Sequence, residues 1–408
     1  MKPASKQTFA IALFLLLNNL GFSQKGIYSY ADTVPLHTQI IDILENTKSG
    51  EIYMLGNTTD LNFEHAKPYF ARVDKNGKIL FTKYFDTEVY SLCSVILLDD
   101  VIKIFGTQNY SGFSQYTTSF DSNGESKSNT LTMDITSGLL EDVVNLNDGT
   151  SLRLSSRRKG DFFNIRISRL DNKLDYATLN FPIKAGQNEI AGNFCMLKDK
   201  SLLILGTSLD DEYQPNESVL HHYTIEGDSL WSITIPDAKR NTSQHIGVDV
   251  NNQIYYMYSL VYEDYTTELF VSTVSEKGEF SNQKSISDII PQGMISLKDG
   301  NMLIYGYKYV VSGESALRKA KFVIVDNKNE VVIQDEIKDT DPPDSEMPSY
   351  EFVLMPSSSE FLTAFQLSDG RIALAGRVFF PVNATTSGEN KRLNKPLLVI
   401  MTKDGEFR

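Results

Sequence analysis

The sequence predicts an all-β fold: a seven-bladed β-propeller of four-stranded antiparallel blades, closed by the N-terminal strand. The first observation is a recurring phrase of polar turn, short apolar run and small residue, as in Lys298 to Lys308 (KDGNMLIYGYK). The residues that close the seven copies are Gly56, Gly106, Ser155, Gly206, Tyr258 (a poor copy), Gly306 and Gly376. They are separated by 50, 49, 51, 52, 48 and 70 residues. Repeats of this length are typical of propeller blades.

The second observation is that each unit contains four short runs rich in Val, Ile, Leu, Phe and Tyr, separated by Gly, Asn and Asp turns. Phe70 to Phe81 (FARVDKNGKILF) shows two such runs and their turn. This spacing suits strands joined by hairpins, and no segment of useful length has apolar residues at helical spacing. A single sheet cannot bury both faces, whereas sheets packed around an axis can, which explains why the phrase recurs.

The N-terminus predicts a secretory signal peptide over residues 1–23, followed by the propeller over 24–408. A basic start precedes an apolar core, Phe9 to Leu17, that is too short to span a bilayer. Gly21 and Ser23 fit the −3 and −1 positions of a cleavage site. The alternative is a buried N-terminal helix. The protein is therefore expected to be exported, to the periplasm or outside the cell.

The last repeat is incomplete and predicts how the ring closes. It stops at Lys403 to Arg408 (KDGEFR), where a fourth strand should begin. Gly26 to Thr33 (GIYSYADT) resembles Ile79 to Thr87 (ILFTKYFDT), the fourth strand of the first repeat. We expect residues 24–34 to be the outermost strand of blade seven, beside Glu406–Arg408 or the residues just before them. Closure removes an exposed sheet edge.

The longest interval, from Gly306 to Gly376, predicts an insertion between blades six and seven at residues 339–358. This stretch is acidic, and its prolines cannot donate ladder hydrogen bonds. Asp339, Asp341 and Asp344 could hold Ca²⁺, but their spacing lacks the glycine and the distal Glu of a calcium loop. A solvated loop is the preferred interpretation.

The repeat pattern DG…L.G…vD.nG.llW resembles the repeats of secreted β-propeller proteins of Bacteroidetes-type bacteria. Gly227 to Ile235 (GDSLWSITI), which contains the only tryptophan, is the nearest copy of its second half. The resemblance covers nearly all of the chain after residue 23. It implies a propeller fold, but its motifs are structural turns that do not specify an activity.

Charge and composition exclude several classes of partner. The formal net charge is −13, and removal of residues 1–23 takes away two lysines, leaving 37 basic against 52 acidic residues. Nucleic acid is therefore not an expected partner, because its binding needs clustered positive charge. No later apolar run is long enough to span a membrane. Cys93 and Cys195 do not form a disulfide framework. We expect a monomer without a cofactor or metal site.

Strand alternation predicts which face of the ring binds a ligand. If the strands of a unit are called a to d, the a–b and c–d turns lie on one face, and the b–c and d–a loops on the other. The a–b and c–d turns are short and rich in glycine, whereas b–c segments such as Thr207 to Ser218 are expected to be long, varied loops. Binding residues collect on such loops. The candidate ligand-binding residues are Tyr110, Phe113, Tyr213, Tyr262, Tyr265, Tyr307 and Tyr309. Exposed tyrosine suits sugar rings or protein anchors, although most of these residues could instead pack against the blade edges.

Catalytic motifs are absent from the sequence. It contains no phosphate-binding glycine loop, nucleophile elbow or zinc-protease helix. His221 and His222 should point to opposite faces of one strand and so cannot chelate a metal together. A glycosidase needs two facing carboxylates, and the candidates Asp210, Asp211, Glu212, Glu263 and Asp264 are not shown by the sequence to converge.

Three functional hypotheses follow. The first is an exported, non-catalytic propeller that binds a protein or glycan partner through its b–c/d–a face. The second is a glycoside hydrolase or lyase that uses carboxylates at the propeller axis. The third is a structural component of the cell envelope.

Overall fold

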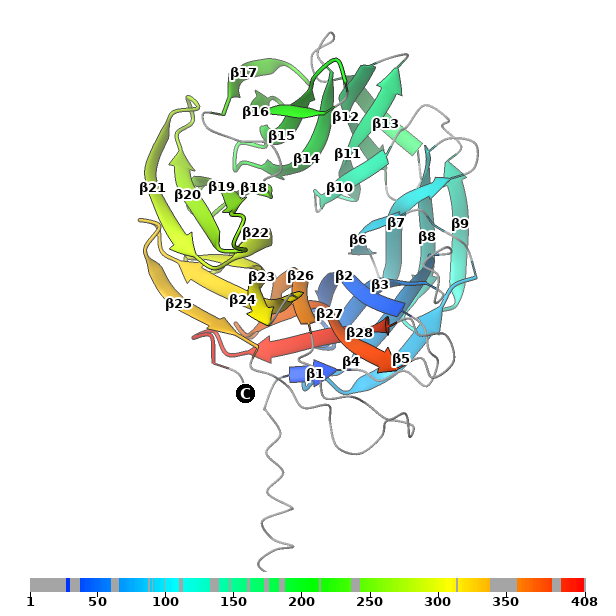
Figure 1. Cartoon of the computed structure of the whole chain (residues 1–408). Coiled ribbons are helices and arrows are strands. Elements are labelled where there is room, and N and C mark those ends of the chain that lie inside the picture. The colour runs from blue at the N-terminus through cyan, green and yellow to red at the C-terminus, as the bar shows by residue number, and fades with distance from the viewer. Residues whose placement is uncertain are drawn as a thin grey trace, which may run out of the picture.

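Seven four-stranded antiparallel sheets stand in a ring around a central axis (Figure 1), so the predicted seven-bladed β-propeller is confirmed. The computed structural model describes residues 27–29, 37–59, 66–86, 89, 91–98, 100–109, 113–132, 139–146, 148–159, 162–171, 176–182, 188–212, 214–235, 243–312, 315–337, 358–383 and 390–406. Nothing in this part of the chain is a helix long and apolar enough to cross a membrane. The predicted signal peptide lies outside the described residues.

Each blade runs from an inner strand at the axis to an outer strand at the rim (Figure 1). Blades one to three are β2 (His37–Asn46), β3 (Glu51–Thr59), β4 (Lys67–Val73), β5 (Ile79–Tyr84); β6 (Ser91–Leu98), β7 (Val101–Asn109), β8 (Phe113–Asp121), β9 (Ser126–Thr132); and β10 (Leu139–Asn145), β11 (Thr150–Lys159), β12 (Phe162–Asp171), β13 (Tyr176–Pro182). Blades four and five are β14 (Glu189–Met196), β15 (Leu202–Leu209), β16 (Pro215–Tyr223), β17 (Ser229–Thr234); and β18 (Gln244–Val248), β19 (Ile254–Val261), β20 (Thr267–Val274), β21 (Phe280–Ser287). Blades six and seven are β22 (Ile290–Ser296), β23 (Met302–Ser312), β24 (Ser315–Val325), β25 (Val331–Glu336); and β26 (Ser358–Gln366), β27 (Ile372–Asn383), β28 (Asn390–Met401), β1 (Ile27–Ser29).

The N-terminal strand β1 closes the ring, as predicted, because it pairs with β28 as the outermost strand of blade seven. Tyr28 faces Leu398 in this antiparallel pair. The partner segment, Leu397–Val399, precedes the predicted Glu406–Arg408. The physical reason is that the chain turns immediately after β28: the Gly405 amide donates to the Thr402 carbonyl at 3.0 Å. β1 therefore takes the outermost position that the fourth strand takes in the other blades.

The recurring small residue faces a β-bulge in the inner strand. In blade six, Pro291 pairs with Gly306 and the next pair is Gly293 with Tyr305, so the inner strand carries an extra residue. A Cβ atom on Gly306 would lie much less than 3.0 Å from the Ile290 carbonyl oxygen, which is too close for two non-bonded atoms. Equivalent bulges occur in all described blades except the fifth, whose β18–β19 register is regular. Blade five accordingly has Tyr258 in place of the small residue.

Apolar side chains fill the spaces between neighbouring blades. Phe322 and Phe361 are fully buried between blades six and seven, and Met54 and Leu398 between blades one and seven. Each such side chain stabilises the ring by roughly 1.5–3 kcal/mol through the hydrophobic effect. The described contacts between blades two and three include a polar one. There the buried guanidinium of Arg153 lies 4.7 Å from the ring centroid of Phe105 and donates to Thr117 Oγ1 at 3.1 Å.

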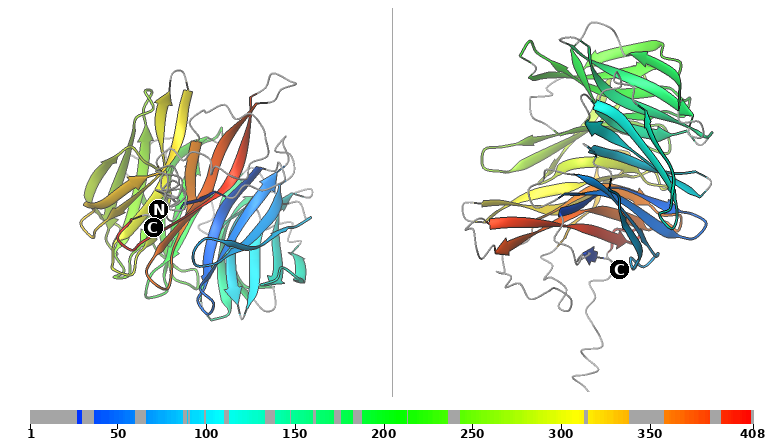
Figure 2. Two further views of the ribbon diagram at one scale, coloured as in Figure 1. Left: turned by 90° about the horizontal axis from the view of Figure 1, so that it is seen from below. Right: turned by 90° about the vertical axis from the view of Figure 1, so that its right-hand side faces the viewer.

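The b–c connections differ from the expected long loops. Strands β23 and β24 pair as far as Ser312 with Ser315, and β27 and β28 as far as Asn383 with Asn390. Tyr307 and Tyr309 therefore lie within β23, and the prediction that they belong to a loop is wrong. These polar b–c sequences extend the strand pairing, because the two strands of a hairpin satisfy each other's backbone hydrogen bonds even where they project beyond the ring. Figure 2 shows the yellow β23–β24 hairpin and the orange-red β27–β28 hairpin projecting on the same side.

The predicted insertion falls almost entirely outside the described residues. Residues 338–357 are not described, and Ser358, assigned by the sequence to the insertion, is the first residue of β26. The described part of the chain resumes at the axis, on the same face as the b–c hairpins.

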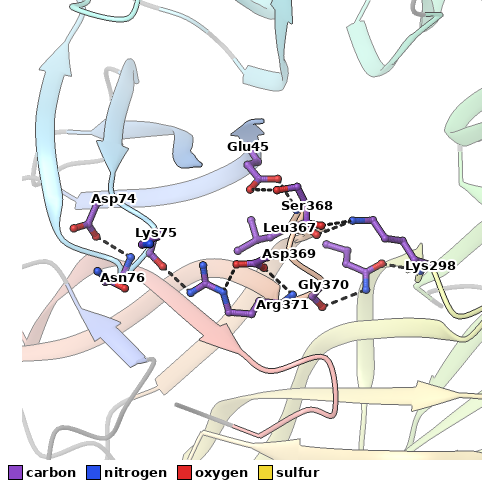
Figure 3. A network of polar contacts seen from close by, with 11 residues as sticks. Glu45, Asp74, Lys75, Asn76, Lys298, Leu367, Ser368, Asp369, Gly370 and Arg371 are labelled. Atoms are coloured by element: carbon purple, nitrogen blue, oxygen red, sulfur yellow. Dashed lines mark hydrogen bonds and ion pairs between the residues drawn. The ribbon is translucent and has the colours of Figure 1, made fainter. Parts of the chain in front are cut away.

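Polar groups on the opposite face, that of the a–b and c–d turns, fasten one blade to the next. Around the a–b turn of blade seven (Figure 3), the amide and hydroxyl of Ser368 donate to the Glu45 carboxylate of blade one at 2.6 and 2.9 Å. Lys298 Nζ of blade six donates to the Ser368 carbonyl at 3.2 Å, and Arg371 Nη1 to the Lys75 carbonyl at 2.7 Å. This face therefore uses its charged groups to hold the ring together.

Candidate ligand-binding site

Three of the predicted tyrosines meet above blades five and six. The ring centroids of Tyr265 and Tyr309 are 5.6 Å apart, and those of Tyr309 and Tyr307 are also 5.6 Å apart, both in edge-to-face geometry. Tyr307 and Tyr309 share one face of β23, because alternate residues of a strand point to the same side. Tyr265 reaches them from the β19–β20 turn. We call these three residues, with Arg318, Glu360 and Arg377, the aromatic–arginine site.

Tyr265 occupies a backbone position that favours glycine. Its φ is 64°, in the left-handed region, and the other described non-glycine residues with positive φ are Asp, Asn or Lys. Its amide donates to the Tyr262 carbonyl at 3.0 Å, which is the hydrogen bond that Gly77 and Gly278 make in their own turns. The Tyr265 side chain nevertheless remains 50% exposed. Strained residues of this kind cluster at ligand sites, where the strain positions a side chain.

Glu360 joins two arginines beside the tyrosines. Its carboxylate is 1% exposed and accepts from Arg318 Nη1 at 2.6 Å through Oε2, and from Arg377 Nε and Nη2 at 2.6 and 2.5 Å through Oε1. Arg377 Nη1 also donates to Gln39 Oε1 of blade one at 2.6 Å. A buried carboxylate needs such partners, because an unpaired charge at this depth is costly. The cluster holds two positive charges against one negative charge.

Each arginine also packs on an aromatic ring. The guanidinium carbon of Arg318 lies 4.6 Å from the centroid of Tyr307, and that of Arg377 lies 4.6 Å from the centroid of Phe379. Burial raises the pKa of Tyr307 to about 12, so the phenol stays neutral. Although burial opposes its charge, the hydrogen bond and the charge of Glu360 raise the pKa of Arg318 above its usual value. The site therefore presents the cationic guanidinium of Arg318 beside the neutral phenol of Tyr307 over a wide pH range.

The predicted site residues lie at different places in the structure. Tyr265, Tyr307 and Tyr309 come together, but Tyr307 is only 6% exposed and forms the floor of the cluster. Tyr262 is exposed and its hydroxyl donates to Glu268 Oε2 at 3.0 Å, within its own hairpin. Phe113 is the first residue of β8, in blade two. Tyr110 and Tyr213 lie outside the described residues.

The ionic half of the site was missed by the sequence reasoning, although one signal was present. Arg377 directly follows the small residue of the blade-seven phrase. The equivalent residues in the other blades are Asn57, Thr107, Ser156, Thr207, Ser259 and Tyr307. An arginine among residues that are mostly small and polar breaks the repeat, and such a break indicates a position with a separate role.

Two of the exposed carboxylates considered for catalysis, Asp210 and Asp264, stabilise turns. Asp210 Oδ1 accepts from the amides of Glu212 and Gln214 at 3.0 and 2.8 Å. Asp264 Oδ1 accepts from the Thr266 amide at 3.0 Å. These bonds fix the b–c turns of blades four and five, as Asp side chains commonly do.

A different set of carboxylates stands on the inner strands, at the bulges. Asp42 accepts from Ser94 Oγ at 2.9 Å and from the Val95 amide at 2.8 Å, which ties blade one to blade two. Burial raises the pKa of Asp42 and of Asp142 to about 6, and that of Glu141 to about 7. Burial, and to a lesser extent the charges of Asp42 and Asp142, raise the pKa of Tyr305. Carboxylates from blades one and three therefore lie close enough to Tyr305 of blade six to interact with it.

The two neighbouring histidines point to opposite faces of β16, as predicted. His221 Nδ1 lies 2.8 Å from Ser232 Oγ and its Nε2 lies 3.0 Å from Glu189 Oε2, a buried chain of hydrogen bonds across blade four. His222 Nε2 lies 2.7 Å from Ser201 Oγ on the other side. Within the described residues, no group of three or more His, Cys, Asp or Glu side chains could hold a metal ion.

Comparison with known proteins identifies the architecture only. No protein-family model matches the chain, and no curated protein sequence matches it. The polysaccharide lyase Uly1 has a similar structure, with a TM-score of 0.50 and 10% identity over 92% of both chains. A Dyadobacter fermentans protein of unknown function has a TM-score of 0.48 and 10% identity over 73% of this chain and 97% of its own. The periplasmic gluconolactonase PpgL of Pseudomonas aeruginosa has 0.48 and 9%, over 72% and 83%. At such identities the likeness shows the propeller fold and no activity.

Proposed function

We propose that the protein is an exported, non-catalytic propeller that binds a glycan chain at the aromatic–arginine site. The observation that carries the proposal is Tyr265, a half-exposed aromatic residue held at a glycine-type backbone position against Tyr309. Left-handed backbone costs an ordinary residue roughly 1–2 kcal/mol. A fold keeps such a cost most readily where the side chain contributes to binding.

The chemistry of the site favours a glycan over a protein partner. Tyrosine and arginine are also common in protein interfaces, but the exposed part of this site is small, because Tyr307 is 6% exposed and the Glu360 side chain 1% exposed. Ligand sites for small units combine aromatic surface with a few fixed polar groups. Guanidinium and carboxylate groups beside tyrosine rings provide donors, acceptors and an apolar surface, which are the contacts that a sugar ring with its hydroxyls requires.

The test is glycan binding by the mature chain, screened on an array and quantified by calorimetry. Tyr265→Gly removes the ring and keeps the backbone conformation, so we expect a loss of affinity of at least about tenfold, or about 1.4 kcal/mol. Phe162→Ala is the matched control, because Phe162 is an equally exposed aromatic residue beside the b–c hairpin of blade three. Binding that survives Tyr265→Gly unchanged would contradict the proposal, and so would a protein partner that binds where no glycan does.

A second candidate function is a hydrolase or lyase at the axis, and the specific observation in its favour is Glu141. Its carboxyl has a pKa near 7 and accepts from Ser156 Oγ at 3.1 Å, and a carboxyl of that pKa suits general acid or base catalysis. The enzyme hypothesis predicts that glycans are cleaved and that Glu141→Gln abolishes cleavage. Binding without release of shorter chains favours the non-catalytic proposal. A purely structural envelope role predicts instead that deleting the gene weakens the envelope while Tyr265→Gly has no effect.

A further inference from the structure

We infer that the glycan bound at the aromatic–arginine site carries a carboxylate, as a uronic acid unit does, and that Arg318 holds it. This inference rests on the proposed function and adds the chemical class of the ligand. It starts from an imbalance of charge: one glutamate serves two arginines, in a chain whose formal net charge is −13. Two guanidinium groups that share one carboxylate retain donors for an anionic ligand.

The two arginines differ in how many guanidinium N–H groups are left for a ligand. Arg377 gives the paired edge of its guanidinium, Nε and Nη2, to Glu360 and its remaining nitrogen, Nη1, to Gln39. Arg318 gives only Nη1 to Glu360, and its Nε–Nη2 edge donates to no described side chain or carbonyl. Its side chain is 37% exposed, against 22% for Arg377. Arg318 is therefore the residue with a free edge.

The free edge has the geometry of a carboxylate receptor. Two parallel N–H groups in one plane match two coplanar carboxylate oxygens, which gives a bidentate, charge-assisted pair. The orientation of the plane is fixed on one side by Glu360 and from below by the Tyr307 ring, 4.6 Å from the guanidinium carbon. A preorganised fork loses little entropy on binding. The tyrosines then lie where the ring bearing the carboxylate, or its neighbour in the chain, would pack.

The experiment compares four polymers as probes: polygalacturonate, neutral dextran, dextran sulfate and polyglutamate. We expect the strongest binding to polygalacturonate. Arg318→Gln should weaken it about tenfold or more, as the loss of hydrogen bonds to a charged group does, and Arg318→Lys should restore only part of it because lysine lacks the fork. Arg371→Gln is the control. Arg371 is also a partly exposed arginine paired with an acid, at 2.8 Å from Asp369 (Figure 3), but it belongs to the face of the a–b and c–d turns.

Each outcome separates the inference from the proposed function. Equal binding of dextran and polygalacturonate, with no effect of Arg318→Gln, would overturn the inference and leave glycan binding intact. Preference for dextran sulfate would overturn the assignment of a carboxylate. Binding of polyglutamate alone, or of none of the four polymers and no glycan on the array, would overturn both. Unfolding midpoints of the variants, measured in parallel, show whether a loss of binding reflects a loss of fold.

Discussion

Replacing Gly306 by alanine should destabilise the ring, because the inner strand leaves no room for a Cβ. The added atom would overlap the Ile290 carbonyl oxygen and lie 3.1 Å from the Gln292 amide nitrogen, both of which are backbone atoms of the bulge. Overpacking of this kind costs about 1–3 kcal/mol, and each ladder hydrogen bond that lengthens costs about 1 kcal/mol more. A smaller unfolded-state gain of about 0.4–1 kcal/mol offsets part of this cost. With one such hydrogen bond lengthened, we expect a net loss of about 2 kcal/mol.

The assay is urea unfolding, followed by far-ultraviolet circular dichroism and by the fluorescence of Trp231. The Trp231 indole, the only one in the chain, donates to the Glu276 carbonyl at 2.7 Å and so reports on the contact between blades four and five. Gly192→Ala is the matched control, since the nearest atom to its new Cβ is the Leu205 carbonyl oxygen at 3.3 Å. The reasoning is refuted if Gly306→Ala unfolds at the same urea concentration as the parent, or if Gly192→Ala is equally destabilised.

Three further predictions concern closure, pH and strain. Deleting residues 24–33 removes β1 and exposes the edge of β28, so the variant should aggregate or unfold at a clearly lower temperature; an equally stable monomer would show that β1 contributes little. Burial raises the pKa of Asp142 from 3.8 to about 6, so the contribution of this residue to the free energy of unfolding falls as the pH rises from about 4 to 6. The stability of Asp142→Asn should therefore rise by up to about 3 kcal/mol relative to that of the parent over this range. A stability difference that does not change with pH would contradict this. Tyr265→Gly exchanges about 1 kcal/mol of backbone strain for a ring contact of similar value, so its unfolding midpoint should stay near that of the parent, and a loss above about 2 kcal/mol would contradict the strain argument.

Much of the fold could be predicted because its determinants are local and repeated. The spacing of Gly56, Gly106 and their equivalents gave the number of blades, and the turn glycines gave the hairpins. The function of the small residue could not be read, because the bulge that requires it lies in a different strand, about sixteen residues earlier in blades one, six and seven. The same contact explains Tyr258. Without a bulge, no carbonyl approaches, and a large side chain fits.

The candidate site was only half predictable, for a related reason. The sequence identified tyrosine as the residue type and the b–c/d–a side as the face, but it assigned Tyr307 and Tyr309 to a loop, because paired strands beyond the disc carry no apolar alternation. Glu360 and its two arginines come from three strands of two blades. Their pairing depends on how neighbouring blades pack, and a single sequence contains no measure of that packing.

The departures from the repeat are concentrated around the proposed site, and this distribution has a physical explanation. Blade five lacks the bulge and places Tyr265 where its turn favours glycine, and blade seven places Arg377 where most other blades have a small polar residue. Each departure costs stability through backbone strain or through the burial of charge. On the opposite face, by contrast, Glu45, Lys298 and Arg371 are engaged in contacts that hold blades one, six and seven together. Stabilising contacts thus account for the charges on one face. They do not account for an exposed, strained tyrosine or for the free edge of Arg318, whereas the proposed ligand binding would account for both.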